Sequence, residues 1–488
     1  MMRGIIFAVC LLMLSIEVMA QDNYDASLIS KDLLPYASAI VRNEETTIEV
    51  KDMDDVITHI KKVVTVLNKN GDDIAHMVIW HNKSNVIRYI KGTYYDEFGK
   101  LNGKFSESDF QDVNAGNDFS LFEDSRVKHY MPAIINYPYT IAYEYEVRSK
   151  QSLNFDTWEP NPQTGVAVEK SKLSFICKPD FNIRYKEVNI PGKVSIGLNK
   201  DKLKTYTWQV QNMKAVKYEP FSPYSRTYLS SVRIAPEKFA YASFSGSFTN
   251  WQQLGKWEYD NLLKDRTEIP DETAQHVKEI TASITDPKQK AKKIYEYMQQ
   301  KTHYISIQVG IGGYQPFLAS DVDKQNYGDC KALVNYTQAL LKVVNINSYY
   351  CIVQAGRENK VSMLSDFASM DQGNHIILCI PFKNDTTWAE CTSQQIPFGF
   401  LGDFTDDRTV LACTPEGGKL MHTPKYTTEE NLEKRKADFV LNEQGELTGN
   451  METTFKGTDY DDRQWVMVDA PADRIKDIKK IYPINNLE

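Results

Sequence analysis

The chain has 488 residues, of which 42% are hydrophobic and 25% charged; this is ordinary globular usage and excludes a disordered protein. A chain of that length predicts about three domains. The formal net charge is −8, with acidic and basic residues interspersed, so the sequence has no electrostatic footprint for nucleic acid and we expect no nucleic-acid partner.

The first residues follow the pattern of a secretory signal peptide, which we assign to residues 1–20. Arg3 supplies a basic start, an apolar run extends from Ile5 to Leu14, and Val18-Met19-Ala20 is a small-residue cleavage pattern. No later apolar run approaches the ~20 residues that a membrane span needs. We therefore expect an exported protein without a membrane span, either periplasmic, in the cell envelope or secreted. Six cysteines remain after cleavage, and this even number leaves the disulfide pairing open.

Residues 25–245 are predicted to form an all-β, sandwich-like domain. Short aromatic and β-branched segments recur there, and residues 141–147 and 206–210 alternate with period two. Asn70-Gly71 stands between two apolar runs and predicts a hairpin turn. The sequence indicates no catalytic site in this domain, which is expected to act as a scaffold or to bind a glycan or peptide ligand.

Residues 250–425 are predicted to form an α+β domain, because helical patterns are followed by strand patterns. The helical patterns cover residues 251–263, 274–284, 287–298 and 330–344, and the strand patterns cover residues 349–353, 375–380 and 386–391. Residues 430–488 then contain one hairpin pattern and one helical pattern, at 470–481. One hairpin and one helix cannot bury a hydrophobic core by themselves. We therefore expect that these residues are part of a C-terminal β domain that is truncated here.

Cys330 follows Gly328-Asp329 at the point where a helical pattern begins. A catalytic thiol must ionise, and a helix N-terminus with an adjacent imidazole lowers a cysteine pKa from ~8.5 into the range ~3.5–7.5. Gly328 permits a tight turn, and the free N–H groups of a first helical turn can face a thiolate or an oxyanion. The pattern therefore predicts that Cys330 is a nucleophile.

The base for such a thiol is a histidine within hydrogen-bond reach. Among the eight histidines, His375 heads an apolar strand, whereas His303 follows a helix and has no strand to hold it. The chain returns past His375 through residues 388–391, where Glu390 could orient the ring. We predict His375 as the general base and Glu390 as the third residue, with Asp385 and Asp403 as alternative carboxylates.

Several of these motifs together resemble the transglutaminase-like superfamily. The motifs are Gly310-Ile311-Gly312-Gly313-Tyr314-Gln315-Pro316, Tyr327-Gly328-Asp329-Cys330-Lys331, Asn374-His375 and Trp388-Ala389-Glu390-Cys391-Thr392-Ser393. More closely, the chain is similar to exported bacterial (Bacteroidetes-type) members that carry a β-rich domain of unknown function before the core and a β domain after it. The resemblance implies a papain-like core with a Cys330, His375 and Glu390 triad.

Two positions depart from the pattern of that superfamily. Its third residue is usually Asp, so Glu390 is one methylene longer, and Ala332 stands where Asp often follows the cysteine. Papain-like enzymes also place a glutamine in the oxyanion hole, for which Gln315 and Gln325 are the candidates. These departures, with the large flanking β domains, motivate an alternative function as a non-catalytic binding or scaffold protein at the cell envelope.

The function predicted from the sequence is thiol-dependent acyl transfer on a peptide or protein substrate, ending in hydrolysis or in a cross-link. No cofactor and no metal are expected. A metal site at Cys330, His375, Cys379 and Cys391 would lack the paired ligand spacing of zinc sites. The glycines at 310–313 are not a phosphate loop, because no Lys-Ser or Lys-Thr follows them.

Overall fold

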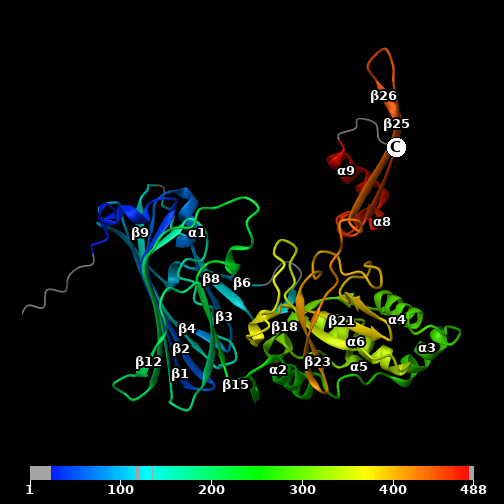
Figure 1. The fold of residues 1–488 in the computed structure, drawn as a ribbon, viewed down its shortest axis with the longest axis horizontal. Coiled ribbons are helices and arrows are strands. Elements are labelled where there is room, and N and C mark those ends of the chain that lie inside the picture. Colours follow the sequence, from blue (N-terminus) through cyan, green and yellow to red (C-terminus); the bar gives the residue numbers. More distant parts are fainter. Residues whose placement is uncertain (1–22, 116–119, 135, 483–488) are drawn as a thin grey trace, which may run out of the picture.

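The N-terminal half of the chain is dominated by one long sheet (Figure 1). The computed structural model describes residues 23–115, 120–134 and 136–482, so the expected signal peptide at residues 1–20 lies outside the described residues. The sheet has eight strands in the order β12 (Ser195–Leu198), β13 (Lys204–Met213), β10 (Val166–Cys177), β1 (Ala39–Asp52), β2 (Asp55–Val66), β9 (Tyr139–Ser149), β4 (Asn85–Tyr95) and β5 (Leu101–Ser106). Strand β1 is parallel to β10 and antiparallel to β2.

Smaller sheets accompany the long one. A three-stranded sheet contains β3 (Met77–His81), β8 (Arg126–Tyr130) and β6 (Gln111–Asn114), and two-stranded sheets pair β11 (Ile183–Val188) with β14 (Ser231–Pro236) and β15 (Lys238–Tyr241) with β16 (Phe244–Ser247). The core of this half includes Phe175, Trp208 and Ile141, which belong to β10, β13 and β9 of the long sheet. In much of β10 and β13 buried residues alternate with more exposed ones, which is the pattern of a sheet that buries one face.

The predicted hairpin at Asn70-Gly71 is wrong. These residues form a 3-10 turn (Lys69–Gly71) that leads into α1 (Asp72–Ala75), and β3 pairs with β8 instead of β2. Two aspartates in the first turn of α1 favour a helix start. Gly71 has a φ of −97°, and a Cβ there would lie 2.3 Å from the Ser38 carbonyl oxygen. A glycine is needed here because the Ser38 backbone lies too close for a side chain, and not because the turn requires a positive φ.

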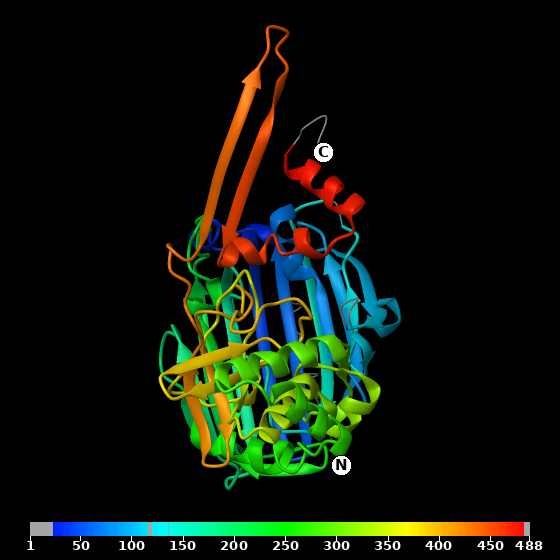
Figure 2. The same ribbon diagram turned by 90° about the vertical axis from the view of Figure 1, so that its right-hand side faces the viewer.

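A five-stranded antiparallel sheet with helices follows in the second half of the chain. Its strands are, in order, β22 (Asp385–Ala389), β21 (His375–Phe382), β20 (Tyr349–Val353), β23 (Thr409–Thr414) and β24 (Gly417–His422). The helices are α2 (Trp251–Glu258), a π-helical turn (Tyr259–Leu263), α3 (Asp271–Thr281), α4 (Pro287–Lys301), α5 (Ala319–Gln325) and α6 (Cys330–Val343). Helix α6 lies against the sheet with nearly all its residues buried, and α3 and α4 lie on the side remote from the long N-terminal sheet (Figures 1 and 2).

The two halves are joined by backbone pairing as well as by the chain itself. Strand β18 (Ser306–Gln308) runs parallel to β7 (Ser120–Glu123), and the short strands β17 (His303–Tyr304) and β19 (Tyr327–Gly328) pair just before α6. The chain is therefore a multidomain, strand-rich protein with several sheets. Each helix among the described residues is too short or too polar to cross a bilayer.

A hairpin projects from the rest of the molecule near the C-terminal end (Figures 1 and 2). It consists of β25 (Leu432–Leu441) and β26 (Leu447–Lys456), which pair only with each other among the described strands. Every residue of β25 is exposed, including Phe439, Val440 and Leu441. Helices α7 (Thr458–Asp461), α8 (Trp465–Val468) and α9 (Pro471–Ile481) follow the hairpin.

Candidate active site

Cys330 is the first residue of α6, as the sequence predicts. Asp329 caps this helix, because its carboxylate accepts a hydrogen bond from the Ala332 N–H at 2.9 Å. Gly328 allows the backbone before the helix to pack closely against its first turn, since a Cβ there would lie 2.8 Å from the Cβ of Ala332. The thiol is thus held at the positive end of a buried helix, where the macrodipole favours negative charge.

His375 is the first residue of β21, and hydrogen bonds of the preceding residue, Asn374, fix the position of that strand end. Asn374 accepts a hydrogen bond from the Ala355 N–H at 2.6 Å and donates one to the Ala355 carbonyl at 3.1 Å. The His375 ring is 9% exposed and meets the ring of Phe404 edge to face. Its Nε2 lies 2.9 Å from Glu390 Oε2. Because Glu390 occupies Nε2, Nδ1 is the ring nitrogen that is left for Cys330.

Glu390 follows β22 and is fully buried, with both carboxylate oxygens satisfied. Its Oε1 accepts hydrogen bonds from the Thr392 N–H at 3.0 Å and from the Thr392 hydroxyl at 2.6 Å, while Oε2 faces the histidine. Leu378 pairs with Ala389, so the returning strand passes beside the start of β21. This register lets the longer glutamate side chain reach the ring. The predicted alternatives lie elsewhere: Asp385 pairs with Lys288 and Asp403 with Arg357.

Electrostatics link the three predicted residues. Burial alone would lower the pKa of His375, but the Glu390 carboxylate and a hydrogen bond with the Cys330 thiol together raise it to about 10. In the same way, burial would raise the pKa of Glu390, but the facing imidazolium and the hydrogen bonds from His375 and Thr392 hold it below its ordinary value. The arrangement therefore stabilises a protonated imidazole between a thiol and a carboxylate.

Cys330 and His375 line one cavity of about 400 Å³ between the two halves of the chain. The second half also contributes Tyr314 and Tyr350, and the N-terminal half contributes Asn82, Asp124 and Ser125. The Gly310 N–H donates to Asp124 Oδ2 at 3.2 Å across this boundary. The cavity thus has walls from segments that are far apart in sequence.

Glu258, at the end of α2, is a lining residue that the sequence analysis missed. It is 1% exposed, and its Oε1 has no hydrogen-bond partner among the residues that the structure describes. Burial raises its pKa to about 8. Nothing in the local sequence Trp257-Glu258-Tyr259 marks this glutamate as different from a solvated one, so only the fold reveals it.

Other residues considered from the sequence do not line this cavity. His303 is exposed and contacts Gln394, and neither Gln315 nor Gln325 is among the lining residues. The described cysteines are all free and buried: Cys177, Cys330, Cys351, Cys379, Cys391 and Cys413. No group of three or more His, Cys, Asp or Glu within residues 23–115, 120–134 and 136–482 is arranged to hold a metal ion.

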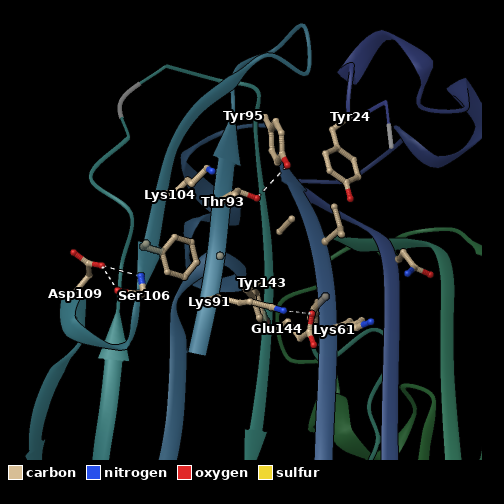
Figure 3. Close-up of a pocket in the computed structure, with 16 residues that line it drawn as sticks. Tyr24, Lys61, Lys91, Thr93, Tyr95, Lys104, Ser106, Asp109, Tyr143 and Glu144 are labelled. Carbon is tan, nitrogen blue, oxygen red and sulfur yellow. Dashed lines mark hydrogen bonds and ion pairs between the residues drawn. The ribbon is translucent and has the colours of Figure 1, made fainter. Parts of the chain in front are cut away.

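A larger hollow, of about 650 Å³, lies on a face of the long N-terminal sheet (Figure 3). Lys61, Lys91 and Lys104 line it with Tyr95, and Lys91 pairs with Glu144 at 3.1 Å. Hydrogen bonds from Tyr89, His59 and Lys91 outweigh the effect of burial and lower the pKa of Glu144 to about 2. No cysteine is among the lining residues, so of these two cavities only the smaller one is lined by a thiol.

Comparisons with known proteins give a family for part of the chain and a fold for most of it. Residues 54–217 match a family described as a domain of unknown function with solved structure (DUF3857). No curated protein matches the chain. The chain is similar to a crystal structure from Parabacteroides distasonis ATCC 8503 described as a "putative protease", with 14% identity and a TM-score of 0.58 over 79% of this chain and 72% of that chain. An M1 zinc metallopeptidase from Deinococcus radiodurans matches with 8% identity and a TM-score of 0.22, over 50% of this chain and 53% of that chain. This score is too low to indicate a shared fold.

Proposed function

We propose that the chain is a thiol-dependent acyl-transfer enzyme that acts on peptide or side-chain amides. The observation that supports this most directly is that His375 contacts both the Cys330 thiol and the Glu390 carboxylate in one buried cluster. The description of the Parabacteroides protein, which shares the fold, agrees with action on peptides. The proposal includes an exported location and a transglutaminase-like, papain-like core at residues 250–425.

In the proposed reaction, the Cys330 proton resides on His375, and the thiolate sulfur attacks the amide carbonyl carbon. The oxyanion of the tetrahedral intermediate lies near the N-terminus of α6, whose free N–H groups stabilise negative charge. The C–N bond then breaks, and the departing nitrogen takes the proton from His375. The product is a thioester with Cys330 and a free amine.

The second half of the reaction releases the acyl group. His375 takes a proton from water, the new C–O bond forms, the C–S bond breaks, and the Cys330 thiolate is regenerated. A second amine in place of water gives a cross-link by the same steps. Glu390 remains ionised throughout and holds the imidazolium in orientation.

Thiol alkylation tests the activated cysteine within one molecule. We expect iodoacetamide at neutral pH to modify Cys330 in the folded protein, with the site identified by peptide mass spectrometry. Cys391 is an internal control, since burial raises the pKa of its thiol and it has no imidazole partner. If Cys330 reacts no faster than Cys391 until the protein is denatured, the proposal fails.

Turnover provides the second test. We expect the wild type to release free amines from a mixture of casein peptides, and the variant Cys330→Ser to release none above background. Retention of full activity by Cys330→Ser would assign the chemistry to other residues.

A further inference from the structure

The backbone under Glu258 is held rigidly, although the residue belongs to no motif. Helix α2 packs against β24 through a glycine pair, where a Cβ at Gly255 would lie 2.3 Å from the Gly418 Cα. Trp251 and Trp257 anchor the helix by donating to the Leu364 carbonyl at 2.8 Å and the Ser245 carbonyl at 3.1 Å. A π-helical turn begins directly after Glu258, and such turns are frequent at functional sites.

The Glu258 carboxyl has no compensation for its burial. It makes no hydrogen bond or ion pair within the described part of the chain, and its Oε1 is a buried acceptor without a donor. Burial is the only influence on the pKa of Glu258, so no basic group offsets it, and its charge acts on Tyr314, Tyr350 and Cys413. A buried polar group without a partner costs about 1–3 kcal/mol, so a carboxyl that persists in such a place suggests a partner outside the chain.

The other charged residues of the cavity leave it short of positive charge. Lys331 pairs with Asp329 at 2.5 Å, and His375 pairs with Glu390. The remaining acids of the lining, Asp124 and Glu258, have no ion pair with a basic side chain among the described residues. Tyr241, Tyr314 and Tyr350 add aromatic rings, whose faces attract cations.

We propose that Glu258 is a specificity-determining residue and that its carboxyl binds a primary ammonium group of the substrate whose acyl group is transferred to Cys330. This inference rests on the proposed function and adds a substrate class to it. The ammonium group supplies the donors that Glu258 lacks and draws the carboxyl into its ionised form. The group belongs either to a free chain terminus or to a lysine-like side chain.

A matched pair of alkylating agents tests the proposal without any substrate. 2-Bromoethylammonium and 2-bromoethanol differ in charge, and each rate at Cys330 is normalised to its rate with glutathione. We expect the wild type to prefer the cationic reagent, and Glu258→Gln to reduce this preference about tenfold, the factor that corresponds to 1.4 kcal/mol. Asp260→Asn, two residues along the chain at an exposed position, is the control that keeps the preference.

The wild type alone gives a second measurement, which does not depend on the folding of a variant. Because the pKa of Glu258 is about 8, the preference for the cationic reagent should increase as the pH rises through that value. Ethylammonium, but not ethanol, should slow alkylation of Cys330 by iodoacetamide. Equal rates for the two reagents in the wild type, or an unchanged preference in a folded Glu258→Gln variant, would overturn the inference.

Peptide substrates separate this inference from the proposed function. Peptides with a free or an acetylated terminus, and with lysine or norleucine, show which ammonium group is bound. A preference for ammonium reagents without any turnover would refute acyl transfer and leave the Glu258 site intact. If turnover is the same with and without either ammonium group, in the wild type and in Glu258→Gln alike, the Glu258 site is refuted and acyl transfer is retained.

Discussion

At the scale of single residues, the cluster combines a buried imidazole with a buried carboxylate. Such a pair is favourable only where hydrogen bonds satisfy the remaining lone pairs. Thr392 provides this second contact, since it donates to Glu390 from both its backbone and its hydroxyl. Thr392 stands in the motif that suggested the family, but its role depends on a turn geometry that the sequence does not reveal.

Glu390→Gln should change the pH dependence of Cys330 alkylation. The negative charge of Glu390 is the largest influence that raises the pKa of His375 towards 10, and glutamine removes that charge at nearly constant shape. With iodoacetate, an anion that the imidazolium attracts to the thiolate, we expect the alkaline limit of rapid alkylation to move to lower pH by about 1 unit or more, where one unit corresponds to about 1.4 kcal/mol. Rate measurements between pH 6 and 10.5 check this, and superimposable profiles would contradict it.

Glu258 should make the stability of the protein depend on pH in a specific direction. Burial raises the pKa of its carboxyl from 4.5 to about 8, so between these values the folded state holds a proton that the unfolded state lacks. The free energy of unfolding therefore receives its full contribution below pH ~4.5 and loses it as the pH rises through about 8. Urea unfolding of wild type and Glu258→Gln at several pH values tests this: the variant should gain stability relative to the wild type as pH increases, and a constant difference would refute it.

Cys330, His375 and Glu390 could be predicted from the sequence as candidate site residues, whereas Glu258 could not. Cys330 and His375 stand at the start of an amphipathic helix and of an apolar strand, so local patterns indicate both their positions and their chemistry. The role of Glu390 follows from the return of the next strand. Glu258 depends instead on contacts between helix α2 and remote strands, which leave no local pattern.

At the scale of elements, most predicted helices and strands of the second half correspond to elements of the structure, but α5, β23 and β24 were not predicted. Residues 330–344 were predicted as a helix and form α6, and the three predicted strands correspond to β20, β21 and β22. The Asn70-Gly71 hairpin failed because the packing of Gly71 against Ser38 is a long-range contact. The pairing of β1 with β10, parallel and distant in sequence, likewise could not be predicted from alternation alone.

The cap of α6 gives an element-scale prediction. Asp329→Ala removes the acceptor for the Ala332 N–H and also the partner of Lys331, and we expect it to lower the free energy of unfolding by about 1–2 kcal/mol. Asp329→Asn retains the cap and should lose less. Thermal or urea unfolding of the two variants gives the comparison, and an equal loss in both would assign the effect to the ion pair.

At the scale of the whole molecule, the β25–β26 hairpin projects from the rest, and neither strand pairs with any other described strand. Two isolated strands are marginally stable in water, and this pair exposes Phe439, Val440 and Leu441. Limited proteolysis should therefore cut first in the turn between residues 441 and 447, which mass spectrometry of the fragments would locate. Early cleavage within β20 to β23 would contradict this.

The position of the cavity between the two halves has a consequence for biosynthesis. Asp124 and Ser125 emerge from the ribosome long before Cys330 and His375, so this wall of the cavity is made before the segments that it faces. The cavity is therefore complete only when the segments around residues 82 and 124 have met α2, α6 and β21, late in the folding of the chain. For the proposed enzyme, this order of synthesis would delay the formation of a substrate-binding cavity until the chain is nearly complete.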